Sequence, residues 1–113
     1  MRPHRRLATV ALAAGLGAAC AAGLRHASPA DVALVAARWP GTTVEDLERG
    51  RRLYVRRCSG CHNLVLPSAH SPRRWPELVD EMVKEARLRP GERDDVVRFL
   101  VAVASDGEGK PRR

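Results

Sequence analysis

The stretch Cys58-Ser59-Gly60-Cys61-His62 places two cysteines three positions apart and a histidine directly after the second cysteine. This Cys-x-x-Cys-His pattern is the attachment signature of a c-type haem. Its two thiols are spaced to form thioether bonds with the two vinyl groups of the ring, and the histidine then reaches the iron from the proximal side. The stretch therefore predicts one covalent haem c, held by Cys58 and Cys61, with His62 as the proximal iron ligand.

Three other sites can be drawn on the same cysteines. A zinc site would combine Cys58, Cys61 and His62 with His70, but adjacent Cys61 and His62 are poor partners in one tetrahedron and the usual zinc spacings differ. A dithiol redox site of the thioredoxin type needs a strand before the first cysteine, and no strand is expected there. A structural disulfide without a cofactor is the third alternative. Haem attachment is the favoured interpretation.

The N-terminus has the pattern of a secretory signal peptide. Three arginines lie within the first six residues, and residues 7–24 carry no charge and are rich in Leu, Ala and Gly. The run that ends in Cys20 resembles a bacterial lipoprotein box, which predicts cleavage after Ala19 and a lipid-modified Cys20. Simple cleavage and an uncleaved anchor are the alternatives. All three predict a periplasmic or extracytoplasmic location, where bacteria attach c-type haem.

Composition narrows the class of protein. The chain has 113 residues, and 20 Lys and Arg against 13 Asp and Glu give a net charge of +7, which falls to +4 without residues 1–19. The remaining arginines alternate with carboxylates and form no basic block, so nucleic acid is not an expected partner. Four aromatic residues are few for the core of a small domain. A covalently fixed apolar cofactor would complete such a core.

Apolar periodicity predicts an all-α fold with three main helices wrapped around one haem. The first helix is expected after the N-cap Thr43 and runs towards Cys58. Leu47, Gly50 and Tyr54 recur on one face of this helix at helical spacing. A glycine inside a helix is destabilising, and its expected use here is the close approach of another helix.

The other two helices follow the haem motif. One is expected to begin at the N-cap Ser71, or nearer Trp75 after an irregular turn, because Pro76 is unfavourable further inside a helix. The last runs from Pro90 to about Ala104. The chain then divides into a signal peptide, a tether and strap, a haem domain and a disordered tail, over residues 1–19, 20–43, 44–104 and 105–113.

Three patterns within residues 44–104 resemble the small class I c-type cytochromes. They are Gly50-x-x-x-Tyr54-x-x-x-Cys58, Trp75-x-x-x-Val79-x-x-Met82, and a closing helix that carries Phe99. The resemblance implies that the first helix crosses the last, with Gly50 permitting the contact and Phe99 packing beside it. It also implies a one-electron carrier that is not an enzyme. The span between His62 and Met82 is shorter than is usual in that family.

The distal iron ligand decides what such a haem can do. Met82 is the only methionine besides Met1, and it lies in register with Trp75, so it is the predicted distal ligand; a methionine ligand raises the reduction potential. His70 is the rival, but it follows His62 closely in a polar turn, from which the opposite face of the ring is hard to reach. An open site is the third possibility, and it would permit ligand sensing or peroxidase chemistry.

Four further residues are expected to line the haem pocket: Tyr54, Leu64, Pro67 and Trp75. The Pro67 carbonyl is a candidate acceptor for the second ring nitrogen of His62, a contact that would orient the imidazole.

Electron transfer needs partners, and the expected ones are extracytoplasmic redox proteins such as a dehydrogenase or a terminal oxidase. A haem-bearing subunit of a larger dehydrogenase is an alternative to the free carrier. Four arginines near the motif form a candidate docking rim for an acidic partner: Arg56, Arg57, Arg73 and Arg74.

Overall fold

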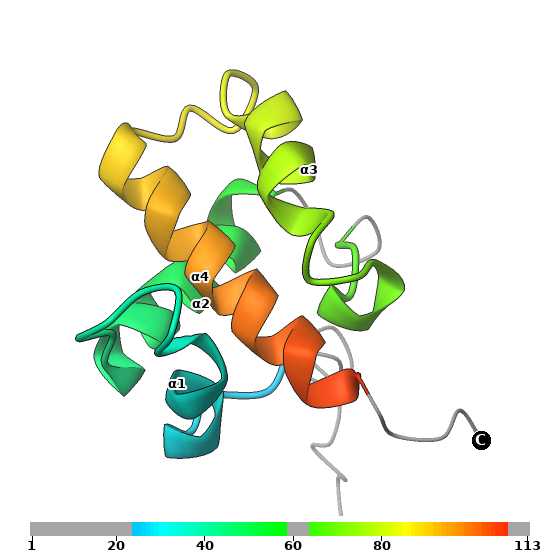
Figure 1. Ribbon diagram of the computed structural model, residues 1–113. Coiled ribbons are helices and arrows are strands. Elements are labelled where there is room, and N and C mark those ends of the chain that lie inside the picture. Colours follow the sequence, from blue (N-terminus) through cyan, green and yellow to red (C-terminus); the bar gives the residue numbers. More distant parts are fainter. Residues whose placement is uncertain (1–23, 59–63, 109–113) are drawn as a thin grey trace, which may run out of the picture.

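Helices α2 (Val44–Arg57) and α4 (Pro90–Gly107) cross at the centre of the molecule (Figure 1). Helices α1 (Pro29–Val35) and α3 (Trp75–Met82) pack against α4, and a short 3-10 helix, η3 (Pro67–Ala69), precedes α3. The computed structural model describes residues 24–58 and 64–108. Within these ranges it has four α-helices and no strand, so the predicted all-α class is confirmed. Three main helices were expected, and α1, within the expected tether and strap, is a fourth.

Helix α2 begins and ends where the sequence predicts. The Thr43 hydroxyl accepts a hydrogen bond from the Asp46 amide at 3.1 Å, and the Asp46 carboxylate accepts one from the Thr43 amide at 2.9 Å. These reciprocal bonds form a capping box, which satisfies two backbone donors at the helix start. Arg56 and Arg57 in the last turn interact favourably with the negative end of the helix dipole. Cys58 therefore lies at the C-terminal end of this helix.

The crossing of α2 and α4 depends on Gly50. A Cβ atom at Gly50 would lie 2.0 Å from the Asp95 carbonyl oxygen and 3.0 Å from the Phe99 Cβ. The absence of a side chain thus lets the two backbones touch, and Phe99, fully buried, packs beside the contact. Both roles expected for Gly50 and Phe99 are confirmed.

Helix α3 begins at Trp75, after a turn over residues 72–74. Pro76 therefore occupies the first turn, where its missing amide hydrogen has no acceptor to lose. The helix ends at Met82, and residues 83–87 form turns in which Arg87 has a φ of 53°. Of the two predicted starting points, the one near Trp75 is confirmed and the one at Ser71 is wrong.

Helix α4 extends to Gly107, three residues beyond the expected end at Ala104. The Ser105 hydroxyl donates to the Val101 carbonyl at 2.7 Å, and Asp106 forms a 3.2 Å ion pair with Arg25. These contacts explain the extra turn, and the long-range partner Arg25 could not be foreseen from local sequence.

The segment before α2 is tied to the globule by a buried carboxylate. Asp31 is 1% exposed and accepts two hydrogen bonds of 2.7 Å from Arg25, together with bonds from the Ser28 amide and hydroxyl. Burial raises the pKa of Asp31, but the bonds from Arg25 and Ser28 outweigh burial and hold the pKa below its usual value. This cluster fixes α1 against α4, close to Asp106.

We expect Asp31→Asn to lower the free energy of unfolding at pH 7 by about 1–3 kcal/mol, because it leaves a buried polar group poorly satisfied. The folded pKa of Asp31 lies below the unfolded one, so this contribution is present above about pH 4 and is lost as the pH falls further. Urea unfolding at pH 7 and pH 3 measures the difference, which should shrink at pH 3. An equal loss at both pH values would contradict the assignment.

We expect Gly50→Ala to lower the free energy of unfolding by about 3 kcal/mol, because the added methyl group overlaps a backbone oxygen and the helices must separate. Gly91→Ala is the matched control, since a Cβ at Gly91 meets no atom within 4 Å. Urea unfolding should place this control within about 1 kcal/mol of the parent protein. Similar values for the two variants would show that the crossing tolerates a side chain.

Candidate functional site

A pocket of 270 Å³ lies between the C-terminal end of α2 and the end of α3. Five residues line it: Arg57, Cys58, Met82, Glu85 and Ala86. Cys58 and Met82 are the two sulfur-containing residues in the described part of the chain, and both face this pocket. The first cysteine of the motif and the predicted distal ligand are thus brought together from two helices.

Cys58 is held in place by the end of its helix. Its amide donates to the Tyr54 carbonyl at 3.1 Å, and its side chain is half-buried. Burial raises the pKa of the Cys58 thiol, which keeps the sulfur uncharged. A half-buried apolar setting suits a thioether, which has no charge to solvate.

Tyr54 and Trp75 anchor the segment that follows the motif. The Tyr54 hydroxyl donates to the Val65 carbonyl, and the Trp75 indole N–H donates to the Pro67 carbonyl at 2.9 Å. The two rings, each 1% exposed, meet edge to face with their centroids 6.2 Å apart. Burial also raises the pKa of Tyr54 well above its usual value, so the hydroxyl stays a donor. These two aromatics therefore fix the backbone of residues 65–67 to the core.

The Pro67 carbonyl, expected to accept from His62, accepts from Trp75. A carbonyl oxygen has two lone pairs, so the bond to Trp75 leaves room for a second donor. His62 lies outside the described residues, and its contact with Pro67 stays a prediction. The role of Pro67 as the acceptor for Trp75 was not predicted, although an indole N–H eight residues downstream is a donor that must be satisfied when it is buried.

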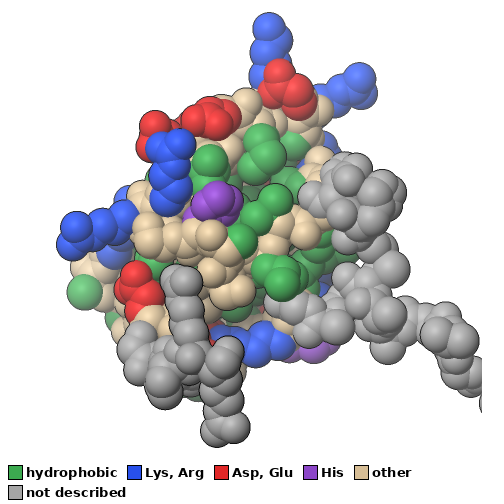
Figure 2. All heavy atoms as spheres, turned by 90° about the vertical axis from the view of Figure 1, so that its right-hand side faces the viewer, with side chains coloured by type: hydrophobic (Ala, Val, Ile, Leu, Met, Phe, Trp, Pro, Cys, Tyr) green, Lys and Arg blue, Asp and Glu red, His purple; other side chains and the backbone are tan. Residues whose placement is uncertain are grey.

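The segment after the motif also exposes apolar side chains. Val65 and Leu66 are 42% and 45% exposed, whereas Leu64 packs partly buried against the core. Figure 2 shows hydrophobic side chains gathered on the face that lies to the right in Figure 1, where η3 and α3 are found. Exposed apolar side chains that gather on one face are a common feature of ligand and partner sites.

The rival distal ligand lies elsewhere. His70 is exposed, and its ring lies nearly perpendicular to that of Trp75, with the centroids 5.2 Å apart. It is not among the residues that line the pocket with Cys58 and Met82. The geometry therefore favours Met82 over His70 as the residue that could contact a haem attached through the motif.

Arg57 has a structural role that the sequence did not reveal. Its guanidinium donates to the carbonyls of Ala86 and Arg87 at 3.4 and 3.1 Å and lies 3.7 Å from the Glu92 carboxylate. Hydrogen bonds from Arg89, with a smaller contribution from the charge of Arg57, lower the pKa of Glu92 to about 2, so this carboxylate is charged. Arg57 thus joins the end of α2 to the α3–α4 connection and closes one side of the pocket.

Two of the four arginines of the expected docking rim are engaged within the protein, and two are not. Arg57 is engaged as described, and Arg74 forms an ion pair with Glu77. Arg56 and Arg73 are exposed and make no hydrogen bond or ion pair with any described residue. Two of the four guanidinium groups remain available to a partner.

Several predicted residues lie outside the described ranges: Cys20, Cys61 and His62. The lipid site, the second thioether and the proximal ligand accordingly stay predictions. Within residues 24–58 and 64–108, no helix is long and apolar enough to cross a membrane. In the same ranges, no three His, Cys, Asp or Glu residues form a cluster that could hold a metal ion.

We expect Arg57→Ala to lower the free energy of unfolding by about 1 kcal/mol, because two carbonyl groups lose a charged donor. Its neighbour Arg56, which has no partner among the described residues, supplies the control, and Arg56→Ala should change stability by less than about 0.5 kcal/mol. Urea unfolding compares the two. An equal effect of both substitutions would contradict the closing role of Arg57.

Comparisons with known proteins add no identification: no protein-family model, no curated protein and no solved structure matches this chain. The functional assignment accordingly depends on the motif and on the geometry around it.

Proposed function

We propose that the chain is a small monohaem c-type cytochrome that carries single electrons between redox proteins outside the cytoplasm. One observation carries the proposal. Cys58, the first cysteine of the attachment motif, and Met82, chosen as distal ligand from sequence alone, line the same pocket from the ends of two helices.

The residues around the pocket fit a covalent haem. Cys58 and Cys61 would hold the ring through thioether bonds, and His62 and Met82 would bind the iron. When bound, the haem supplies a one-electron Fe(III)/Fe(II) couple, and a methionine ligand favours the ferrous state. The described pocket of 270 Å³ lies below the usual range of about 300–1,000 Å³ for ligand sites. It would enclose part of a porphyrin and leave one edge of the porphyrin exposed, as electron transfer between proteins requires.

The described residues favour a carrier over an enzyme or a sensor. Sensing and peroxidase chemistry need an open iron position, and Met82 at the pocket wall is suited to fill it. The available guanidinium groups of Arg56 and Arg73 suit an acidic partner surface, whether that of a dehydrogenase or a terminal oxidase. A lipid at Cys20 would keep the carrier at the membrane surface, on the periplasmic or extracytoplasmic side. The alternative, a haem-bearing subunit of a larger dehydrogenase, would use the same site. Co-purification with that enzyme would distinguish such a subunit from a free carrier.

Visible spectroscopy tests the cofactor. The full chain, produced in cells that attach c-type haem, should show the sharp ferrous α-band of a low-spin c haem. The absorbance should stay with the polypeptide after denaturation, because thioether bonds survive it. A double variant, Cys58→Ala with Cys61→Ala, should lose the covalent haem. A parent protein that carries no haem under these conditions would overturn the proposal.

A pair of substitutions tests the distal ligand. In Met82→Ala, the weak far-red absorption band of ferric iron bound to a methionine sulfur should disappear, and the reduction potential should fall. His70→Ala should leave both unchanged, since this ring lies away from the pocket. The opposite outcome, with His70→Ala changing the spectrum and Met82→Ala leaving it intact, would assign the ligand to His70.

A further inference from the structure

The chain turns directly after Met82, the last residue of α3, and residues 83–88 form what we call the Met82 turn. The Ala86 amide donates to the Met82 carbonyl at 2.9 Å, and the Leu88 amide donates to the Val83 carbonyl at 3.0 Å. The turn is thus bonded to the backbone of Met82 itself. Where Met82 lies in the pocket wall therefore depends on the conformation of this turn.

The Met82 turn has an unfavourable backbone conformation at Arg87. This residue has a φ of 53°, in the left-handed region, where a side chain is crowded by its own backbone. Such a conformation persists only where contacts with the surrounding structure hold it. The buried side chain of Leu88 anchors the end of the turn. The backbone of the turn needs further contacts from the rest of the fold.

Arg57, the residue directly before Cys58, supplies such contacts. Its Nη1 atom donates to the carbonyls of Ala86 and Arg87, at 3.4 and 3.1 Å. A charged donor makes a stronger hydrogen bond than a neutral one. The two bonds connect the end of α2 to Ala86, which is itself bonded to Met82. A short chain of hydrogen bonds therefore joins the attachment motif to the backbone of the predicted distal ligand.

We propose that Arg57 is a positioning residue for the distal ligand: it holds the Met82 turn against the end of α2 and so keeps the Met82 sulfur on the iron. This inference rests on the proposed function, with Met82 as the distal ligand. A methionine sulfur carries no charge, so its binding depends on how well the surrounding residues hold it in place. Loss of the Arg57 bonds should raise the fraction of molecules in which the sulfur has left the iron.

Imidazole binding to the ferric, haem-loaded full chain at pH 7 measures this fraction. Imidazole binds iron that Met82 has left, so its apparent Kd falls as that fraction rises. We expect Arg57→Ala to bind imidazole about fivefold more tightly than the parent protein, which corresponds to about 1 kcal/mol. Loss of the far-red band of the methionine-bound ferric iron during the titration reports the displacement.

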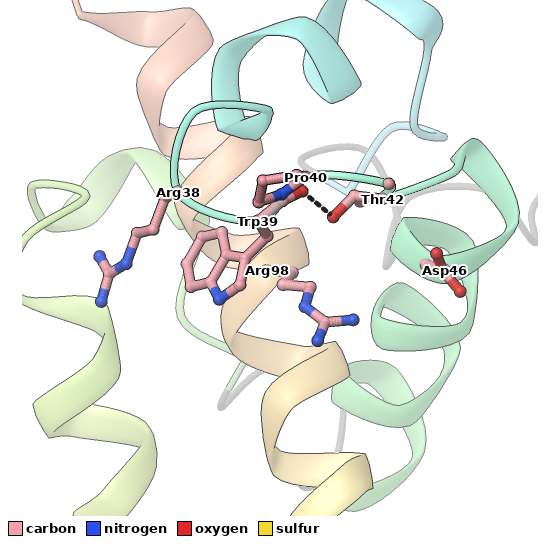
Figure 3. Close-up of a pocket in the computed structure, with 7 residues that line it drawn as sticks. Arg38, Trp39, Pro40, Thr42, Asp46 and Arg98 are labelled. Carbon is pink, nitrogen blue, oxygen red and sulfur yellow. Dashed lines mark hydrogen bonds between the residues drawn. The ribbon is translucent and has the colours of Figure 1, made fainter.

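Two control variants separate positioning from general effects. Asp31→Asn lowers stability at a cluster on α1, and Arg38→Ala removes one positive charge from an exposed side chain stacked on Trp39 (Figure 3). Arg38 lines a separate pocket of 240 Å³ that shares no residue with the pocket at Cys58. Both controls should bind imidazole within about twofold of the parent protein. If either control matched the gain in Arg57→Ala, the proposal would be wrong.

Amide hydrogen exchange tests the turn itself. The Ala86 and Leu88 amides should exchange about fivefold faster in Arg57→Ala and at the parent rate in Asp31→Asn, as a local opening of the turn requires. Unchanged exchange or unchanged imidazole affinity in Arg57→Ala would overturn the role of Arg57. A parent protein that carries haem but lacks the far-red band would instead overturn the ligation by Met82, and with it this proposal.

Discussion

The contact between Gly50 and the Asp95 carbonyl is the constraint on which the rest of the structure depends. No side chain fits between α2 and α4 at this point, where a Cβ would lie 2.0 Å from a backbone oxygen. The contact fixes how α2 lies against α4, and α3 packs on the same helix α4. It therefore fixes where α2 ends, beside the turn that follows α3. Cys58 and Met82 share a pocket as a consequence of this packing.

Much of this arrangement could be predicted, because its causes are local. The Thr43 cap, the glycine at the crossing and the proline at the start of α4 each express a backbone requirement that a few neighbouring residues reveal. The sequence allows two starting points for α3, and Pro76 in the first turn is consistent with the observed start at Trp75. The haem attachment predicted from the spacing of the motif stays a prediction, because residues 59–63 lie outside the described ranges.

What could not be predicted depends on partners distant in sequence. Arg57 looks like a docking residue until the carbonyls of Ala86 and Arg87 are placed beside it. Arg25 reaches both Asp31 and Asp106, which lengthens α4. Exposed arginines follow no periodic pattern in the sequence. Whether such an arginine stabilises the fold or is available to a partner can therefore be decided only from the structure.

We propose that this small helical fold is organised to hold a haem covalently next to Met82. The mass of the intact mature protein, measured under denaturing conditions, tests the covalent part most directly. We expect a mass above that of the polypeptide by one haem, after correction for any lipid at Cys20. A mass equal to the polypeptide alone, or lower by two hydrogens because Cys58 and Cys61 form a disulfide, would contradict it.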